Sequence, residues 1–111
     1  VDGPEISKYG VVIQSKNEKS ISGLIEKPKY RNAPTNLASI GRYVLTPDIF
    51  DILRELPKGL GDEIQLVDAI NLQAQKNAVG TVILEGTRFD CGSIDGFISA
   101  TTHEYKKKGN K

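Results

Sequence analysis

A carboxylate and an ammonium stand side by side at Glu26 and Lys27, directly before Pro28. The carboxylate can accept hydrogen bonds from two hydroxyl groups, and the ammonium can bind a phosphate as a compact charge. A sugar phosphate offers both kinds of group, so this pair of residues could bind one. A charged strand end that faces solvent is the alternative interpretation, and the spacing of the residues alone favours it.

Gly10 is the second candidate, because it stands inside a β-branched run that predicts a strand over 9–14. A glycine inside a strand weakens the packing and often marks a close approach of a ligand to the backbone. It can equally mark a bulge, and the residue pattern leaves both possibilities open.

The third candidate is Asp90, which stands with Cys91 and Gly92 where an expected strand end gives way to a helix. In open α/β sheets, ligands collect beyond the carboxyl ends of the strands, so a carboxylate there could bind Mg²⁺. A turn or capping role is the alternative, and the sequence alone favours it. Cys91 has no local helper for nucleophilic chemistry, and His103 has no partner at metal-ligand spacing.

The first two candidates belong to a predicted hairpin, with strands over 9–14 and 20–26 around a polar turn. One register places Ser15 opposite Ser20 at the turn, and Tyr9 then lies opposite Glu26. A slip of one residue places Gly10 opposite Glu26 instead. Either register brings the bare glycine backbone near the carboxylate.

The rest of the chain alternates between strand and helix patterns. The expected strands cover 37–45 and 79–84, and the expected helices cover 47–56, 63–76 and a segment from Ser93 to about Tyr105. Thr46 and Ser93 are predicted caps of the first and last helix. Asp62 and Gln65 predict a capping box at the start of the second helix. This order of elements predicts an α/β fold.

Composition describes an ordinary globular protein of 111 residues, 38% of them hydrophobic and 26% charged. The net charge of +1 gives no reason to expect nucleic acid or an anionic membrane as a partner. One cysteine excludes an internal disulfide and fits a reducing compartment. The chain contains no methionine, not even at its start, so we expect it to be a segment of a longer protein.

Taken in order, six segments resemble bacterial UTP–glucose-1-phosphate uridylyltransferases, and the resemblance runs from Tyr9 to about Tyr105. The segments are Tyr9-Gly10-Val11-Val12, Ile25-Glu26-Lys27-Pro28-Lys29, Ala33-Pro34-Thr35-Asn36-Leu37-Ala38, Gly41-Arg42-Tyr43-Val44-Leu45-Thr46-Pro47, Gly61-Asp62-Glu63-Ile64-Gln65-Leu66-Val67-Asp68-Ala69-Ile70 and Phe89-Asp90-Cys91-Gly92. The resemblance implies the C-terminal portion of a Rossmann-like nucleotidyltransferase fold over residues 1–111, with a mixed sheet, flanking helices and a β-hairpin.

The resemblance also implies a reaction, in which the phosphate of glucose 1-phosphate attacks the α-phosphorus of UTP and yields UDP-glucose and pyrophosphate. It implies that Gly10 offers its backbone to the sugar and that Glu26 binds glucose hydroxyls. Lys27 would bind the sugar phosphate and serve as a catalytic residue, and Asp90 would help to hold Mg²⁺. A cytoplasmic homo-oligomer, with no nucleic acid or membrane partner, is the expected setting.

One departure from the family is large, because the glycine-rich loop that grips UTP is absent from these residues. We therefore expect the chain alone to bind uridine nucleotide poorly, to turn nothing over and to self-associate through uncovered apolar surface. A non-catalytic sugar-phosphate-binding or oligomerisation module derived from the family is the alternative function.

Overall fold

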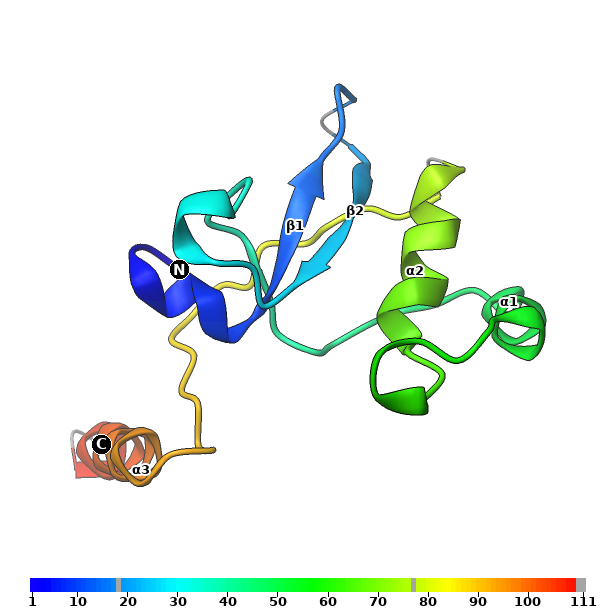
Figure 1. Cartoon of the computed structure of the whole chain (residues 1–111). Helices are drawn as coiled ribbons and strands as arrows, with labels where there is room; N and C mark the ends of the chain where they lie inside the picture. The colour runs from blue at the N-terminus through cyan, green and yellow to red at the C-terminus, as the bar shows by residue number, and fades with distance from the viewer. Residues whose placement is uncertain (18, 77, 110–111) are drawn as a thin grey trace.

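Within the residues that the structure describes, three strands and three α-helices form the fold, joined by three short 3-10 helices (Figure 1). The computed structural model describes residues 1–17, 19–76 and 78–109, without the side chain of Leu60. The elements are η1 (Pro4–Lys8), β1 (Gly10–Gln14), β2 (Ile21–Glu26), η2 (Tyr30–Asn32), β3 (Ala38–Ser39), α1 (Ile49–Glu55), η3 (Leu60–Asp62), α2 (Leu66–Gln75) and α3 (Ile94–Gly109).

The sheet has the order β2-β1-β3, and every pair of neighbouring strands in it is antiparallel. The expected mixed sheet is therefore wrong for the described residues, because 79–84, the other predicted strand, pairs with none of these three strands. The predicted hairpin is confirmed, and it uses both of the registers that the sequence left open. At the turn, Ser15 faces Ser20 and their hydroxyl oxygens lie 3.0 Å apart. A bulge then shifts the pairing by one residue, so that Gly10 lies opposite Glu26 at the far end.

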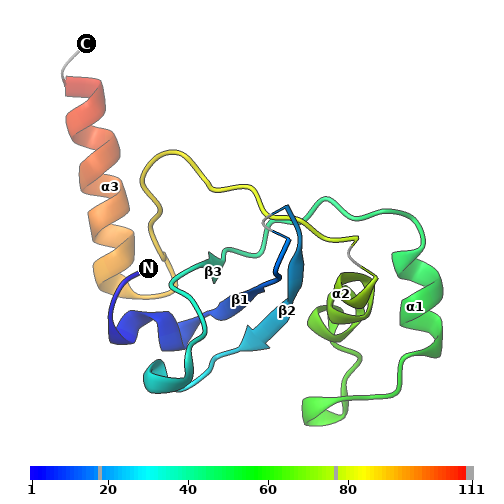
Figure 2. The same cartoon turned by 90° about the horizontal axis from the view of Figure 1, so that it is seen from above.

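The core lies between the hairpin and α2, and α1 packs on the outer side of α2 (Figure 2). Apolar residues at helical spacing on α2 meet the inward side chains of the hairpin. The buried members of this cluster are Val12, Ile21, Leu24, Ile49, Ala69, Ile70 and Ala74. Full burial of one large aliphatic side chain contributes about 1.5–3 kcal/mol, so this cluster is the main source of stability.

A side chain of α2 takes the place of a further strand at the outer edge of β2. The Leu24 N–H donates to Asn71 Oδ1 at 2.6 Å, and Asn71 Nδ2 donates to the Leu24 carbonyl at 3.1 Å. Gly23 makes room for this contact, because a Cβ atom there would lie 2.9 Å from Asn71 Oδ1. The two hydrogen bonds fix α2 against the hairpin at one defined position.

The helices α1 and α2 begin later than the sequence predicts, and the caps predicted for them are wrong. Asp48 occupies the N-cap position of α1, while the Thr46 hydroxyl bonds the Asp48 carboxylate and accepts from the Gln73 amide at 3.3 Å. Hydrogen bonding of the Asp48 carboxylate, first with Thr46 and then with Gln73, lowers the pKa of Asp48. Asp62 lies in η3 with φ of 59°, and Gln65 is the N-cap residue of α2. A tight turn, closed by the Asp62 N–H to Gly59 carbonyl bond, takes up the residues that were expected to start this helix.

Two predicted strands are not formed as predicted. The segment 37–45 contributes only Ala38–Ser39, because Gly41 with φ of 71° turns the chain away. The segment 79–84 is assigned to no strand, and within the described residues its backbone bond to the hairpin runs from the Ile21 N–H to the Val79 carbonyl. A strand needs a neighbour, and none of the described strands lies beside 81–84.

An apolar surface remains uncovered as a result. Val82 is 96% exposed, and Ile83 and Leu84 are exposed as well. The last helix, α3, starts where predicted, since Ser93 Oγ accepts from the Gly96 N–H at 3.1 Å, but no residue of α3 is buried. Self-association through these surfaces stays a prediction. None of the helices in the described part of the chain has the length and apolar character that a membrane crossing requires.

We expect Asn71→Ala to lower the free energy of unfolding by about 1–3 kcal/mol, because two backbone groups of Leu24 lose their partners. Urea denaturation of the intact gene product measures this change as a lower midpoint with an unchanged slope. Asn32→Ala, at the exposed end of η2, is the matched control and should stay within about 0.5 kcal/mol. Equal losses in the two variants would contradict a structural role for the Asn71 side chain.

Candidate functional site

Three residues form a row across one end of the sheet, one from each strand. Gly10 of β1 pairs with Glu26 of β2 on one side and with Ser39 of β3 on the other. A Cβ atom added to Gly10 would lie 3.1 Å from Glu26 Oε2 and 3.7 Å from Ser39 Cβ. Directly opposite residues of an antiparallel sheet project to the same face, so the glycine leaves a hollow between a carboxylate and a hydroxyl.

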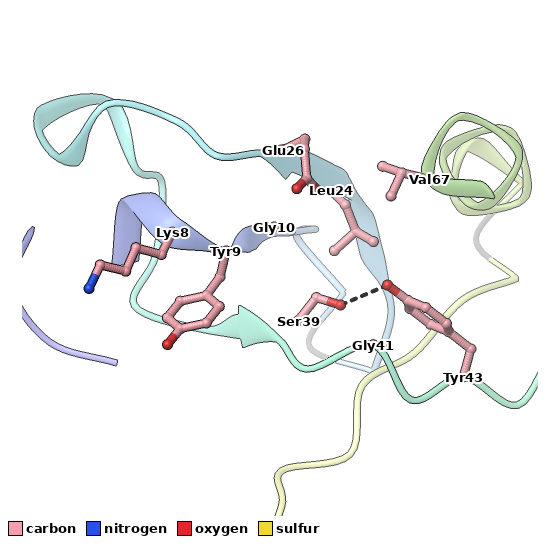
Figure 3. A pocket seen from close by; sticks show the side chains of 9 residues that line it. All are labelled: Lys8, Tyr9, Gly10, Leu24, Glu26, Ser39, Gly41, Tyr43 and Val67. Atoms are coloured by element: carbon pink, nitrogen blue, oxygen red, sulfur yellow. Dashed lines mark hydrogen bonds between the residues drawn. The ribbon is translucent and has the colours of Figure 1, made fainter. Parts of the chain in front are cut away.

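This hollow is part of a pocket of about 220 Å³ (Figure 3). Leu24 and Val67 line its apolar end, and Lys8 and Tyr9 line the opposite end. Drug-sized ligands occupy about 300–1,000 Å³, so the pocket suits a smaller ligand with several polar groups. The helix α2 supplies Val67, so the Asn71 contact that holds α2 also closes this end of the pocket.

A second hydroxyl group enters the pocket from the segment after β3. The hydroxyl oxygens of Ser39 and Tyr43 lie 3.0 Å apart (Figure 3). Gly41, with its positive φ of 71°, makes the turn that brings Tyr43 back over Ser39. A residue with a side chain rarely adopts this backbone conformation, so the glycine is what allows the hydroxyl pair to form.

The two lysines near the pocket differ in their surroundings. Lys8 Nζ lies 3.0 Å from both carboxylate oxygens of Glu5, whose hydrogen bond and charge raise the pKa of Lys8. Lys27 follows the last residue of β2 in a left-handed conformation with φ of 45°, and its N–H donates to the Tyr9 carbonyl at 3.0 Å. The exposed Lys27 side chain lies outside the lining of the pocket, next in sequence to Glu26.

Asp90 lies in a turn two residues after Arg88 and outside the lining of the pocket. Its Oδ1 accepts from the Gly92 N–H at 3.0 Å, which is the turn role that the sequence favours. Its charge makes a small contribution to the raised pKa of Lys8, after the hydrogen bond and charge of Glu5. The Arg88 guanidinium stacks 4.5 Å from the centre of the Tyr9 ring and fastens this segment to the sheet.

Asp90 could hold a magnesium ion only as part of a larger set of ligands. Among the described residues, no cluster of three or more histidine, cysteine or acidic side chains is present. Mg²⁺ is commonly held by one or two carboxylates together with substrate phosphates and water. One exposed carboxylate with a free oxygen fits that donor set.

The structure thus brings Gly10 and Glu26 together, has Lys27 next to Glu26 in the chain and leaves both Lys27 and Asp90 outside the lining of the pocket. Sequence reasoning missed Ser39 and Tyr43. The short strand β3 puts Ser39 beside the glycine, and that pairing has no local sequence signal. Gly41, standing between the two residues, was the one available sign of a turn.

Comparisons with known proteins identify the family and the fold of the chain. The family model described as nucleotidyl transferase matches residues 1–107. A UTP–glucose-1-phosphate uridylyltransferase of Pseudomonas aeruginosa is 47% identical over 105 residues, which are 92% of this chain and 38% of that protein. One of Staphylococcus epidermidis is 47% identical over 104 residues, with 91% and 36% covered. The chain therefore spans well under half the length of these relatives.

Solved structures give the same result for the fold. A UDP-glucose pyrophosphorylase complexed with UDP-glucose superposes with a TM-score of 0.83 at 45% identity, covering 96% of this chain and 42% of that one. A UTP-bound UGPase from Acinetobacter baumannii gives a TM-score of 0.77 at 38% identity, covering 94% and 36%. The predicted α/β fold of the nucleotidyltransferase type is confirmed.

The same substitution should have very different effects on stability at two glycines of the hairpin. We expect Gly10→Ala to change the free energy of unfolding by less than about 0.5 kcal/mol, since the exposed end of Glu26 can move aside. Gly23→Ala should cost about 1–3 kcal/mol, since Asn71 Oδ1 is fixed by its hydrogen bond and cannot move without breaking it. Urea denaturation of both variants measures the difference. A larger loss for Gly10→Ala would show that Gly10 is required for folding and not for an open pocket.

Proposed function

The chain belongs to the nucleotidyl transferase family, and from this premise we propose that it supplies the sugar-phosphate half of a UTP–glucose-1-phosphate uridylyltransferase. The complete enzyme forms UDP-glucose and pyrophosphate from UTP and glucose 1-phosphate. The names of the relatives and the complex of a similar structure with UDP-glucose support this proposal. The nucleotide half of the site is proposed to lie outside these 111 residues, which cover 38% of the first relative.

The row of Glu26, Gly10 and Ser39 is the observation that carries the proposal. An ionised carboxylate accepts hydrogen bonds only, so Glu26 suits two neighbouring hydroxyls of a sugar ring. Gly10 has no side chain between this carboxylate and Ser39, so a ring can lie close to the backbone of β1. The pocket of about 220 Å³ has the size for one sugar ring and not for an oligosaccharide.

Lys27 is proposed as the residue that binds and orients the sugar phosphate, and in this sense as a catalytic residue. Its left-handed backbone releases it from the strand pattern in which neighbours point to opposite faces. Its side chain can therefore serve the same ligand as Glu26. The phosphate must approach the charged α-phosphate of UTP, so a cation at this place lowers the repulsion between the two anions and fixes the attacking oxygen.

Asp90 is proposed as one ligand of a catalytic Mg²⁺. Bound Mg²⁺ would neutralise phosphate charge during the transfer. Asp90 would hold it at the rim of the pocket, through the carboxylate oxygen that the Gly92 N–H does not occupy. The remaining ligands would be phosphate oxygens and water.

The proposed setting is a homo-oligomer in the cytoplasm. The single free Cys91 fits a reducing compartment, and the exposed apolar residues of 82–84 and α3 offer surface for association. The alternative of a non-catalytic module is not favoured, because the relatives named above are uridylyltransferases.

In the intact gene product, we expect Glu26→Ala to raise the KM for glucose 1-phosphate about 10- to 100-fold and to leave the KM for UTP nearly unchanged. Lys27→Ala should lower kcat/KM for glucose 1-phosphate by a similar factor. Each variant loses charge-assisted hydrogen bonds, which contribute about 1.5–3 kcal/mol. Steady-state formation of UDP-glucose and calorimetric titration with glucose 1-phosphate measure both effects.

Glu55→Ala at the end of α1 and Lys16→Ala in the hairpin turn are matched controls, because both residues are exposed and lie outside the pocket. Retained sugar affinity and activity in both Glu26→Ala and Lys27→Ala would overturn the assigned roles. An equal loss in the controls would point to a general effect of surface charge.

Asp90→Asn should raise the Mg²⁺ concentration for half-maximal activity about tenfold or more, since an amide is a weaker ligand for Mg²⁺ than a carboxylate. The asparagine keeps the oxygen that accepts from the Gly92 N–H, so the turn should survive. Asp95→Asn, in the first turn of α3, is the control. An unchanged Mg²⁺ dependence in Asp90→Asn would remove Asp90 from the metal site.

A further inference from the structure

The pocket has two polar walls with different hydrogen-bonding capacity. The carboxylate wall is Glu26, on the β2 side, and the hydroxyl wall is Ser39 and Tyr43, on the β3 side (Figure 3). Gly10 forms the floor between the two walls. In the sugar-binding role proposed above, only Glu26 makes hydrogen bonds to sugar hydroxyls, and Ser39 serves only as the far side of the gap over Gly10. No hydrogen bond to the ligand has yet been assigned to the Ser39 and Tyr43 hydroxyls.

The hydroxyl wall can do what the carboxylate cannot. Two hydroxyl groups carry two O–H donors, and the 3.0 Å contact between Ser39 and Tyr43 uses one of them. One donor and several lone pairs remain available to a ligand. Glu26, when ionised, offers acceptors only. A ligand that fits both walls must therefore donate to one side and accept from the other.

The turn at Gly41 and the contact with Ser39 orient the Tyr43 hydroxyl. The left-handed Gly41 reverses the chain, and the Tyr43 ring points its oxygen at Ser39 (Figure 3). Tyr43 is 40% exposed and lies outside the buried core cluster, so its burial adds little to the stability of the fold. Its hydroxyl contacts Ser39, which lines the same pocket.

We infer that the Ser39–Tyr43 hydroxyl pair is a specificity-determining element that donates a hydrogen bond to a ring oxygen or hydroxyl of the sugar, opposite the hydroxyls bound by Glu26. This inference rests on the proposed function. It predicts that the enzyme requires a particular oxygen on the side of the sugar that faces β3. A sugar phosphate that lacks this oxygen leaves the remaining donor of the pair without a partner.

The test uses Tyr43→Phe in the intact gene product, because this change removes one oxygen and keeps the ring. We expect the KM and Kd for glucose 1-phosphate to rise about three- to tenfold, as for the loss of one neutral hydrogen bond, with the KM for UTP unchanged. Ser39→Ala should give an effect of similar size. Tyr30→Phe, in the exposed η2 outside the pocket, is the matched control and should change neither constant.

A series of monodeoxy glucose 1-phosphates then identifies the oxygen. For one of them, wild type and Tyr43→Phe should have equal kcat/KM, because the contact is already missing in the ligand. Full activity of Tyr43→Phe with glucose 1-phosphate, or an equal penalty for every deoxy sugar, would overturn the inference and leave the proposed function standing. A wild-type protein that forms no UDP-glucose would overturn both.

Discussion

The pair of hydrogen bonds between the Asn71 side chain and the backbone of Leu24 is the contact on which the rest of the structure depends. The outer edge of β2 would otherwise expose an unpaired donor and acceptor, and one amide side chain satisfies both. The same contact fixes α2 at one height along the hairpin. Val67 thereby closes the pocket, and the space for Asn71 requires the bare Gly23.

The second constraint is the bulge that separates the two ends of the hairpin. Without it, the register that pairs Ser15 with Ser20 would continue and would place Tyr9 opposite Glu26. A phenol ring would then stand beside the carboxylate in place of the hollow over Gly10. A single extra residue in β2 thus converts a filled sheet surface into an open pocket.

The sequence allowed the prediction of those features that depend on neighbouring residues. The hairpin, the helices and the cap at Ser93 follow from local periodicity and capping, and they are present. The segment 79–84 has a strand pattern but no strand beside it in the described part of the chain, and pattern alone cannot supply a partner. The hydroxyl wall was missed for the same physical reason, since Ser39 reaches the site only through its pairing with Gly10.

Tyr9 shows how the separate parts of the site are joined. Its carbonyl accepts the Lys27 N–H at 3.0 Å, and its ring lies under the Arg88 guanidinium at 4.5 Å. An exposed cation–π contact contributes only about 0.5–1 kcal/mol, so the segment that carries Asp90 is held far less firmly than the sheet. The end of the pocket proposed to bind the sugar is therefore held by the hairpin and α2, whereas the segment of the proposed metal ligand has a weaker attachment to the sheet. This division suits the proposed transfer, in which the sugar must stay fixed while a nucleotide phosphate and its metal ion come and go.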